Sequence, residues 1–421
     1  MSRGSARPPR TSDPYGVGPV RSLIAPILAV VGLVLVAVFS FNLLNGDVPF
    51  VGGPKASNGQ AGNGNGDGGQ QLTPAPSNVV IVEPDAAFKG SIVYAKAGNV
   101  WIQSGKDVHQ LTTDGGDSMP SWSPDGQYVY FIRTTPNQKG FWPEKGVPTR
   151  YALDIPDLMR VKADGSSQPE KLATGKFRQG RYTWSYWIRQ PVVSPDGKSI
   201  AIVSDAPNPD KSNVVLQFLN PDTGKIRSAN APESGILGHE DPEWRPDGKA
   251  VAFVKNGRDG TSGKPTILRY DTTTKKTKLL TTGGYAGPSY SPDGRYLAAT
   301  RTTNLGTDVV ILDGENGREL LRITTDGSSF APTWSPAGDG IAYLHLQGQT
   351  VDLKLAELDG IGPDWTVKDT VALTEVSGLD ASSKPHWFIP ADQLPPPTPA
   401  PTAAPTPSSS SSVAPSASSA P

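Results

Sequence analysis

Pro288-Ser-Tyr-Ser-Pro-Asp-Gly294 is one copy of a stretch that recurs along the chain as Pro, any residue, an aromatic residue and Ser-Pro-Asp-Gly. Proline presets φ and glycine leaves φ free, so Pro-Asp-Gly predicts a tight turn. The aromatic residue precedes the turn on a short strand, and an apolar strand such as Tyr296-Leu-Ala-Ala299 follows it. Each copy therefore predicts two strands joined by a turn.

The other copies share this pattern with small departures. They are Pro120-Ser-Trp-Ser-Pro-Asp-Gly126, Pro191-Val-Val-Ser-Pro-Asp-Gly197, Pro242-Glu-Trp-Arg-Pro-Asp-Gly248, Pro332-Thr-Trp-Ser-Pro-Ala-Gly338 and the degenerate Pro385-His-Trp-Phe-Ile-Pro390. The first proline of each copy lies 71, 51, 46, 44 and 53 residues after the first proline of the copy before it. Apart from the first interval, this spacing is close to the roughly 40–50 residues of a four-stranded propeller blade. The chain is therefore predicted to be a β-propeller.

The two ends of the repeat region complement each other. Strand-like segments at 91–95, 99–103 and 108–112 come before the first copy and have no inner strand of their own, while the last copy has no outer strands after it. Pairing the two remnants completes a sixth blade and removes the open edges of a row of blades. The sequence thus predicts an all-β, six-bladed β-propeller over residues 79–390, closed by both termini.

This combination of repeats resembles the WD40-like propeller repeat of the TolB family, and the resemblance covers residues 79–390. It implies a six-bladed propeller in the cell envelope. TolB works in a protein complex, but resemblance in fold does not transfer that role. The chain also departs from TolB, because residues 47–78 leave no room for a separate N-terminal domain.

An uncharged apolar stretch at residues 22–46 is long enough to cross a bilayer core. Four arginines and a single acid, Asp13, precede it, so the positive-inside rule leaves residues 1–21 in the cytoplasm. We expect an uncleaved signal anchor in a bacterial cell membrane, with the propeller outside the cytoplasm. A cleaved signal peptide is the alternative, and both interpretations export the propeller.

Low-complexity segments flank the propeller. Residues 47–78 are rich in Gly and Asn and predict a flexible linker, and residues 391–421 predict a disordered Pro/Ser/Ala-rich tail. A formal net charge of −1 argues against a nucleic-acid partner. The absence of cysteine excludes disulfides, thiolate metal sites and a cysteine nucleophile.

The long first interval contains two insertions, at 134–156 and 176–190, which are expected as loops on the same face. They carry the aromatic residues and arginines that are enriched at binding hot spots. The candidate binding residues are Phe141, Trp142, Arg150, Arg178, Arg181, Tyr182, Trp184, Tyr186, Trp187 and Arg189. In the alternative interpretation, the aromatic residues of the insertions pack on each other as a local cap.

Signals for catalysis are weak. The chain has no Gly-x-Ser-x-Gly elbow and no phosphate-binding glycine loop. Some TolB-like propellers are polysaccharide lyases with a histidine-ligated metal, and the residues that could serve such a site are His239, Asp241 and His386, near Asp117 and Glu240. We expect no cofactor and a non-enzymatic module that binds a protein, a peptide or a cell-wall glycan. The alternative is a carbohydrate-active enzyme with a metal or acids in the channel.

Overall fold

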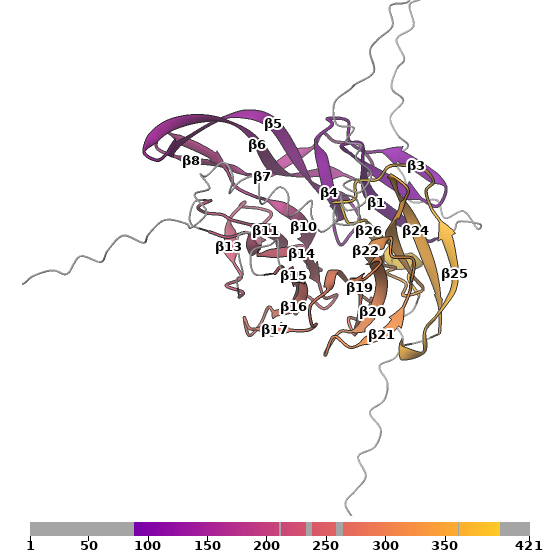
Figure 1. Ribbon diagram of the computed structural model, residues 1–421. Helices are drawn as coiled ribbons and strands as arrows, with labels where there is room; N and C mark the ends of the chain where they lie inside the picture. The colour runs from indigo at the N-terminus through magenta and orange to yellow at the C-terminus, as the bar shows by residue number, and fades with distance from the viewer. Residues whose placement is uncertain (1–87, 210–211, 233–237, 258–263, 361, 396–421) are drawn as a thin grey trace, which may run out of the picture.

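The computed structural model describes residues 88–209, 212–232, 238–257, 264–360 and 362–395. These residues form six antiparallel blades arranged in a ring, as Figure 1 shows. The predicted all-β, six-bladed propeller is confirmed. Within the described ranges, the helical elements are two short 3-10 helices, η1 (Gly362–Asp364) and η2 (Ala391–Gln393).

Each blade has four strands that follow one another from the axis outward. Blade 1 consists of β4 (Asp117–Trp122), β5 (Tyr128–Glu144), β6 (Val147–Lys162) and β7 (Glu170–Thr174), with β8 (Lys176–Gln179) and β9 (Tyr182–Ser185) added to its sheet. Blade 2 consists of β10 (Arg189–Val193), β11 (Ile200–Ser204), β12 (Val215–Leu219) and β13 (Ile226–Ser228). Blade 3 consists of β14 (His239–Trp244), β15 (Ala250–Lys255), β16 (Thr266–Asp271) and β17 (Thr277–Leu279). Blade 4 consists of β18 (Tyr285–Tyr290), β19 (Tyr296–Thr303), β20 (Gly306–Asp313) and β21 (Glu319–Arg322). Blade 5 consists of β22 (Ser329–Trp334), β23 (Gly340–Gln347), β24 (Thr350–Asp359) and β25 (Thr366–Ala372). The closing blade consists of β26 (His386–Phe388), β1 (Ser91–Lys96), β2 (Asn99–Ser104) and β3 (Asp107–Gln110).

The closing blade joins the two ends of the propeller, as predicted. β1 and β26 are antiparallel, with Ser91 opposite Phe388 and Val93 opposite His386. The indole of Trp387 donates a hydrogen bond to the Lys89 carbonyl at 2.8 Å. The ring is therefore closed by main-chain pairing between segments almost 300 residues apart.

The core is divided among the junctions between blades. Six main apolar clusters are found in the described part, and each combines side chains from the facing sheets of two neighbouring blades. At the junction of blades 2 and 3, for example, Phe218 contacts Trp244 and Tyr270 with ring centroids 5.6 Å apart in both pairs. Middle strands are consequently buried on both faces, which explains why β11 reads as an unbroken apolar run.

The repeated Ser-Pro-Asp-Gly segment builds the turn after each inner strand. In blade 2, the Ser194 hydroxyl donates to Asp196 Oδ1 at 2.6 Å and accepts from the Ser199 amide at 3.0 Å. Blade 5 has Ala337 in place of the aspartate, and there Ser335 bonds Asp339 at 2.6 Å instead. These aspartates are therefore turn-formers, and the turns lie together on one side of the ring, the turn face.

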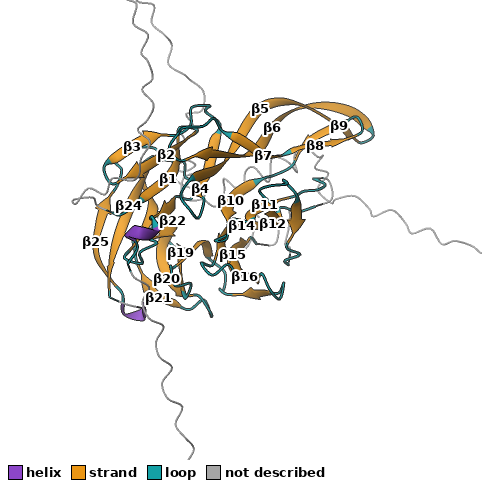
Figure 2. Cartoon of the chain, turned by 180° about the vertical axis from the view of Figure 1, so that it is seen from behind, coloured by secondary structure: helices purple, strands orange, loops and turns teal. Residues whose placement is uncertain are grey.

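The two insertions of blade 1 are strands, and their prediction as loops is wrong. β5 and β6 continue past their blade as a long hairpin that pairs from Tyr128–Lys162 outward to Glu144–Val147. Its tip bends at Lys145 and Gly146, both with positive φ, which suits a two-residue turn. Residues 151–155 of β6 alternate between buried or half-buried positions and exposed ones, a strand signal that the loop assignment overlooked. Figures 1 and 2 show β5, β6 and β8 reaching beyond the ring of blades.

The remaining predictions concern segments outside the described residues. These are the cytoplasmic segment 1–21, the membrane span 22–46, the linker 47–78 and most of the tail 391–421. Among the residues with a described structure, no helix combines the length and apolar character needed to cross a bilayer.

Candidate functional site

The projecting part of blade 1 is a small four-stranded sheet, which we call the arm. It comprises the insertion residues 134–156 of β5 and β6 together with β8 and β9, in the order β6-β5-β9-β8. β9 joins β5 at Phe141, which faces Thr183, and β8 pairs with β9 from Lys176–Ser185 to Gln179–Tyr182. The two insertions, distant in sequence, therefore form one element.

One face of the arm is a cluster of aromatic rings. Trp142 lies at its centre, with ring centroids 5.9 Å from Phe177, 5.6 Å from Tyr182 and 5.8 Å from Trp184. Tyr151 meets the Trp184 ring edge-on at 5.0 Å. All these side chains are half-buried. The aromatic residues thus pack on one another, as in the alternative cap interpretation, while each keeps part of its surface in solvent.

The opposite face of the arm is cationic around a single ring. Cross-strand partners lie on the same face of a sheet, and Phe141 is paired with Arg150 on one side and with Thr183 on the other. Thr183 in turn faces Arg178. Both arginines are exposed, and among the described residues neither forms an ion pair. The arm therefore presents two exposed arginines beside Phe141, whose ring also stacks on that of Tyr182 at 6.2 Å.

Three more of the predicted residues lie at the edges of the arm. Arg181 is exposed in the β8–β9 turn, with its guanidinium 5.4 Å from the Tyr182 ring centroid. The Tyr186 ring lies 6.3 Å from Phe177 at the root of the arm. The Trp187 amide donates to Asp205 Oδ1 at 2.7 Å, which places Trp187 against blade 2.

Arg189 does not lie on the arm. It is 5% exposed at the start of inner strand β10, and its Nη1 is 3.9 Å from Glu240 Oε1. The inner strands contact one another around the axis, so the arginine faces the axial channel. Its assignment to the second insertion is therefore wrong, because the sequence does not show where the inner strand begins.

The axial channel holds a network of ionisable and amide side chains, the axial cluster. Gln190 donates to Asp241 Oδ1 at 2.6 Å and accepts from the Asp241 amide at 3.0 Å. Lys384 donates to Glu243 Oε2 at 2.9 Å and to the Pro288 carbonyl at 2.7 Å. These hydrogen bonds link blades 2, 3 and 4 and the closing blade across the axis.

Burial perturbs the titration of this cluster. The pKa of Glu240 is raised to about 7 by its removal from water, and the nearby Arg189 only partly offsets this. The pKa of Asp241 is also raised by burial, against the attraction of Lys384. Burial lowers the pKa of His386 to about 4, so this imidazole is neutral at physiological pH.

The residues of the alternative metal site form hydrogen bonds with different partners. His239 Nδ1 accepts from the Leu216 amide at 2.9 Å, and His386 Nδ1 accepts from the Trp122 amide at 3.0 Å. Asp117 is held in a two-point contact by Arg133. No group of three His, Cys, Asp or Glu suited to a metal ion is present among the residues described. The convergence that the enzyme alternative required is therefore not found in that part of the chain.

Gln190, Glu243 and Lys384 were not predicted as members of the axial cluster. Two of them directly precede the proline of a repeat, as do Met119, Asp241, Gly287 and Ala331. In five inner strands this residue has a positive φ and lies at a register shift, as in a β-bulge. Aligning the repeats on their proline would have brought these positions together.

Comparison with known proteins agrees with this architecture. A family model described as the TolB beta propeller domain matches residues 183–368. An uncharacterized protein of Agrobacterium fabrum is 27% identical over 294 residues, which cover 65% of this chain and 82% of that protein. The Tol-Pal system protein TolB of Francisella tularensis subsp. tularensis is 25% identical over 297 residues, and the match covers 65% of this chain and 59% of the relative.

Solved structures show the same fold. TolB from Acinetobacter baumannii superposes with a TM-score of 0.51 at 21% identity, covering 71% of this chain and 66% of that one. A protein of Agrobacterium tumefaciens assigned to TolB gives a TM-score of 0.51 at 19% identity, covering 72% and 95%. The described part of the chain is thus a six-bladed β-propeller, and these matches show that it is similar to TolB.

Proposed function

We propose that this chain is a protein-binding module of the bacterial cell envelope, held at the membrane by residues 22–46 and docking its partner on the arm. Its relative in Francisella tularensis is named a Tol-Pal system protein, which supports a role in an envelope protein complex. The matched part is 59% of that relative, so the identity of the partner does not follow from it.

The arm is the observation that carries this proposal. It extends beyond the ring (Figure 1), so its two faces are open to a large partner. Its aromatic rings hold one another in place, which lowers the conformational entropy lost when a partner binds. Tryptophan, tyrosine and arginine are the residues that contribute most at protein interfaces.

The cationic face favours an acidic partner. Arg150 and Arg178 flank Phe141, and Lys139, two residues before Phe141 on β5, lies exposed on the same face. Exposed charges of one sign steer association with a surface of the opposite sign and make it sensitive to salt. The partner surface is therefore proposed to combine carboxylates with an apolar contact for Phe141.

A capture experiment with charge-reversed full chain tests the arm. The variant Arg150→Glu/Arg178→Glu leaves the aromatic cluster intact, and Lys276→Glu/Arg318→Glu, which reverses two exposed charges on the turn face, is the matched control for charge. Proteins are captured from detergent-solubilised membranes of the producing cell and quantified by mass spectrometry. We expect a set of proteins that is reduced at least about tenfold with the arm variant and unchanged with the control, corresponding to about 1.4 kcal/mol or more. Equal capture by wild type and arm variant would show that the arm is not the docking site.

Membrane attachment is tested separately. A chain lacking residues 22–46 but carrying a cleavable signal sequence is expected in the soluble envelope fraction, whereas the full chain sediments with membranes. Recovery of both chains in the same fraction would contradict the proposed anchor.

A further inference from the structure

A second candidate site lies on the turn face, between blades 2 and 3. A surface pocket of about 420 Å³ opens there. Its apolar wall includes Trp244, Pro195 and Pro246, and its polar wall includes Arg227, Lys198 and Asp196. We call it the blade 2–3 pocket.

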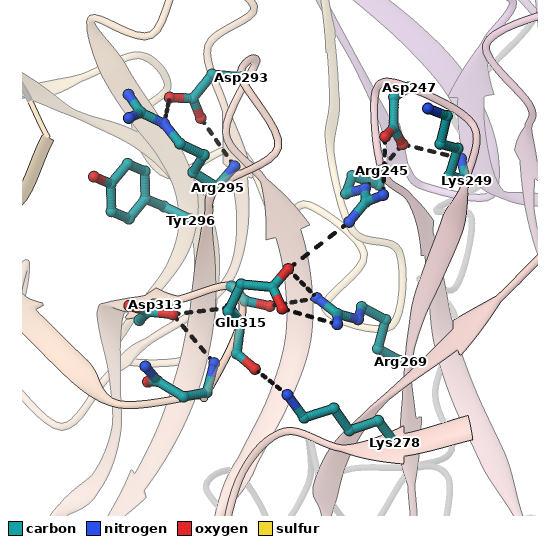
Figure 3. Close-up of polar contacts among 12 residues, drawn as sticks. Arg245, Asp247, Lys249, Arg269, Lys278, Asp293, Arg295, Tyr296, Asp313 and Glu315 are labelled. Carbon is teal, nitrogen blue, oxygen red and sulfur yellow. Dashed lines mark hydrogen bonds and ion pairs between the residues drawn. The ribbon is translucent and has the colours of Figure 1, made fainter. Parts of the chain in front are cut away.

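At the next junction, between blades 3 and 4, a glutamate of the chain itself lies at the corresponding turn, with its side chain 65% exposed. Figure 3 shows Glu315, on the turn between β20 and β21, pointing at Arg269. The two guanidinium nitrogens of Arg269 lie 2.6 Å and 3.0 Å from the two carboxylate oxygens. Arg245 Nη1 is 3.9 Å from Glu315 Oε1, and Lys278 donates to the Glu315 main-chain carbonyl at 2.7 Å. The blades thus hold both the side chain and the backbone of a glutamate.

The turns that reach into the two junctions have the same backbone structure. In blade 4, Asp313 Oδ1 accepts hydrogen bonds from the Glu315 and Asn316 amides at 2.8 Å and 3.1 Å. In blade 3, Asp271 Oδ1 accepts from the amides of Thr273 and Thr274 at 3.0 Å and 2.6 Å. Thr273 therefore occupies the position of Glu315, and its short side chain carries no carboxylate. The blade 2–3 pocket lies beside this turn and is lined by the preceding residue, Thr272.

The cationic wall of the pocket is available to a ligand. Arg227 faces Phe218 across β12 and β13, and Lys278 faces Arg269 in blade 3. Phe218 therefore stands where Arg269 binds the Glu315 carboxylate, and Arg227 stands where Lys278 binds the main-chain carbonyl. Arg227 is the cation that remains at this position. Its guanidinium lies 4.5 Å from the centroid of the Phe218 ring, and it forms no ion pair with any residue in the described ranges. The acids beside it are already engaged, since Asp196 bonds Ser194 and Asp247 bonds Arg245.

We propose that the blade 2–3 pocket binds an acidic side chain presented by a peptide segment of a protein partner, in the place that Glu315 fills at the next junction. Arg227 binds the carboxylate, and the apolar wall with Trp244 contacts the rest of the side chain. A peptide is favoured over other carboxylates because the internal occupant is recognised through its main-chain carbonyl as well as its side chain. The site lies on the face opposite the arm, so it goes beyond the proposed docking site.

The probe is the capped peptide Asp-Gly-Glu-Asn-Gly, which has the sequence of residues 313–317. Its binding to the detergent-solubilised full chain is measured by ligand-observed NMR titration, beside the same peptide with Gln in place of Glu. Loss of a charge-assisted hydrogen bond pair corresponds to about tenfold in affinity or more. We expect such a loss for the Gln peptide and for the Arg227→Gln variant. The control Arg318→Gln, an equal charge change on the same face, is expected to bind as wild type does.

A self-filling variant gives a second measurement that needs no added ligand. Thr273→Glu is expected to raise the thermal unfolding midpoint relative to Thr273→Gln and to abolish peptide binding. The rise is expected to disappear when Arg227→Gln is added. Peptide binding that does not depend on Arg227, or Thr273→Glu behaving as Thr273→Gln, would overturn the proposal. The proposal would also be overturned if a glucuronic-acid oligosaccharide bound in an Arg227-dependent way and the peptide did not bind.

Discussion

Glu240 is a carboxyl group whose protonation differs between the folded and unfolded chain. Burial raises its pKa to about 7 from an ordinary value of 4.5. Below pH 4.5 the group is protonated in both states. Between pH 4.5 and 7 the unfolded chain releases the proton and the folded chain retains it, so folding is disfavoured progressively as the pH rises.

Replacing Glu240 by Gln removes this dependence, because an amide does not titrate. We expect wild type to lose on the order of 2 kcal/mol of unfolding free energy relative to Glu240→Gln between pH 5 and pH 8. Asp205, whose pKa burial also raises to about 7, is present in both proteins and cancels in the comparison. Denaturant titrations at several pH values measure the difference, and parallel profiles for the two proteins would contradict it.

The Lys384–Glu243 pair joins the closing blade to blade 3 with little exposure to water. The side chains are 15% and 11% exposed. Removing one partner of a buried pair leaves an uncompensated charge, which costs about 3 kcal/mol or more. We expect Lys384→Met to destabilise the chain by about that amount and Lys384→Met/Glu243→Gln to recover part of it. A double-mutant cycle from chemical unfolding measures the coupling, and additive effects would show that the pair contributes nothing.

At this scale, the sequence predicted residue types better than their surroundings. Trp, Tyr and Arg in the insertions were identified as candidates from composition alone, and nine of the ten lie on the arm or at its root. Arg189 was misplaced because a one-dimensional sequence does not show where a bulged inner strand starts. The axial cluster combines side chains from three blades with a main-chain carbonyl from a fourth. The sequence marks these positions only when the repeats are aligned on their proline.

At the scale of elements, the arm depends on one residue more than on any other. Trp142 contacts the rings of Phe177, Tyr182 and Trp184, and so attaches the β8–β9 hairpin to β5. Only one residue pair, Phe141 with Thr183, is registered between the β5 and β9 strands. An isolated two-stranded hairpin is marginally stable in water.

Trp142→Ala is therefore expected to release β8 and β9 while leaving the ring folded. Amide hydrogen exchange in residues 176–185 should increase at least about tenfold, since local opening becomes easier by about 1.4 kcal/mol or more. Exchange in β19 and β20 should remain as in wild type. Unchanged protection of the hairpin would show that main-chain pairing, and not the aromatic cluster, holds the arm together.

The strands of the ring were predictable because each blade repeats the same local signals. A serine, proline, aspartate and glycine in a fixed order specify the turn, and the strand after it opens with a mostly apolar run. The arm lacked such repetition, so its strands were assigned as loops. The alternation of Leu153, Asp154 and Ile155 was visible in the sequence, but the pairing of two separate insertions was not.

The whole molecule is a ring whose stability depends on its last closed junction. Trp387 packs edge-on against Phe88 at 5.5 Å and bonds the Lys89 carbonyl. Trp to Ala substitutions in cores cost about 3–5 kcal/mol. We expect Trp387→Ala to lower the unfolding free energy by about that amount. Leu305→Ala, at a position that is 84% exposed, is the control and should have no measurable effect.

The effect of Trp387→Ala should extend around the ring, because each blade is one half of two core clusters. Unfolding followed by hydrogen exchange in blade 3, on the far side from the closing strand, tests this. Faster exchange there at low denaturant is expected for the variant. An effect confined to β1, β2 and β26 would show that the blades unfold independently.

The pairing of β1 with β26 also fixes how the molecule responds to mechanical load. Because the strands are antiparallel, the chain enters the ring at Ser91 and leaves it at Phe388, directly opposite each other. A force pulling the two ends apart would act across the ladder and break its hydrogen bonds one pair after another, like a zipper, instead of loading them together in shear. Tension between the proposed N-terminal attachment and a partner bound beyond residue 390 would therefore open the propeller at its closing blade first.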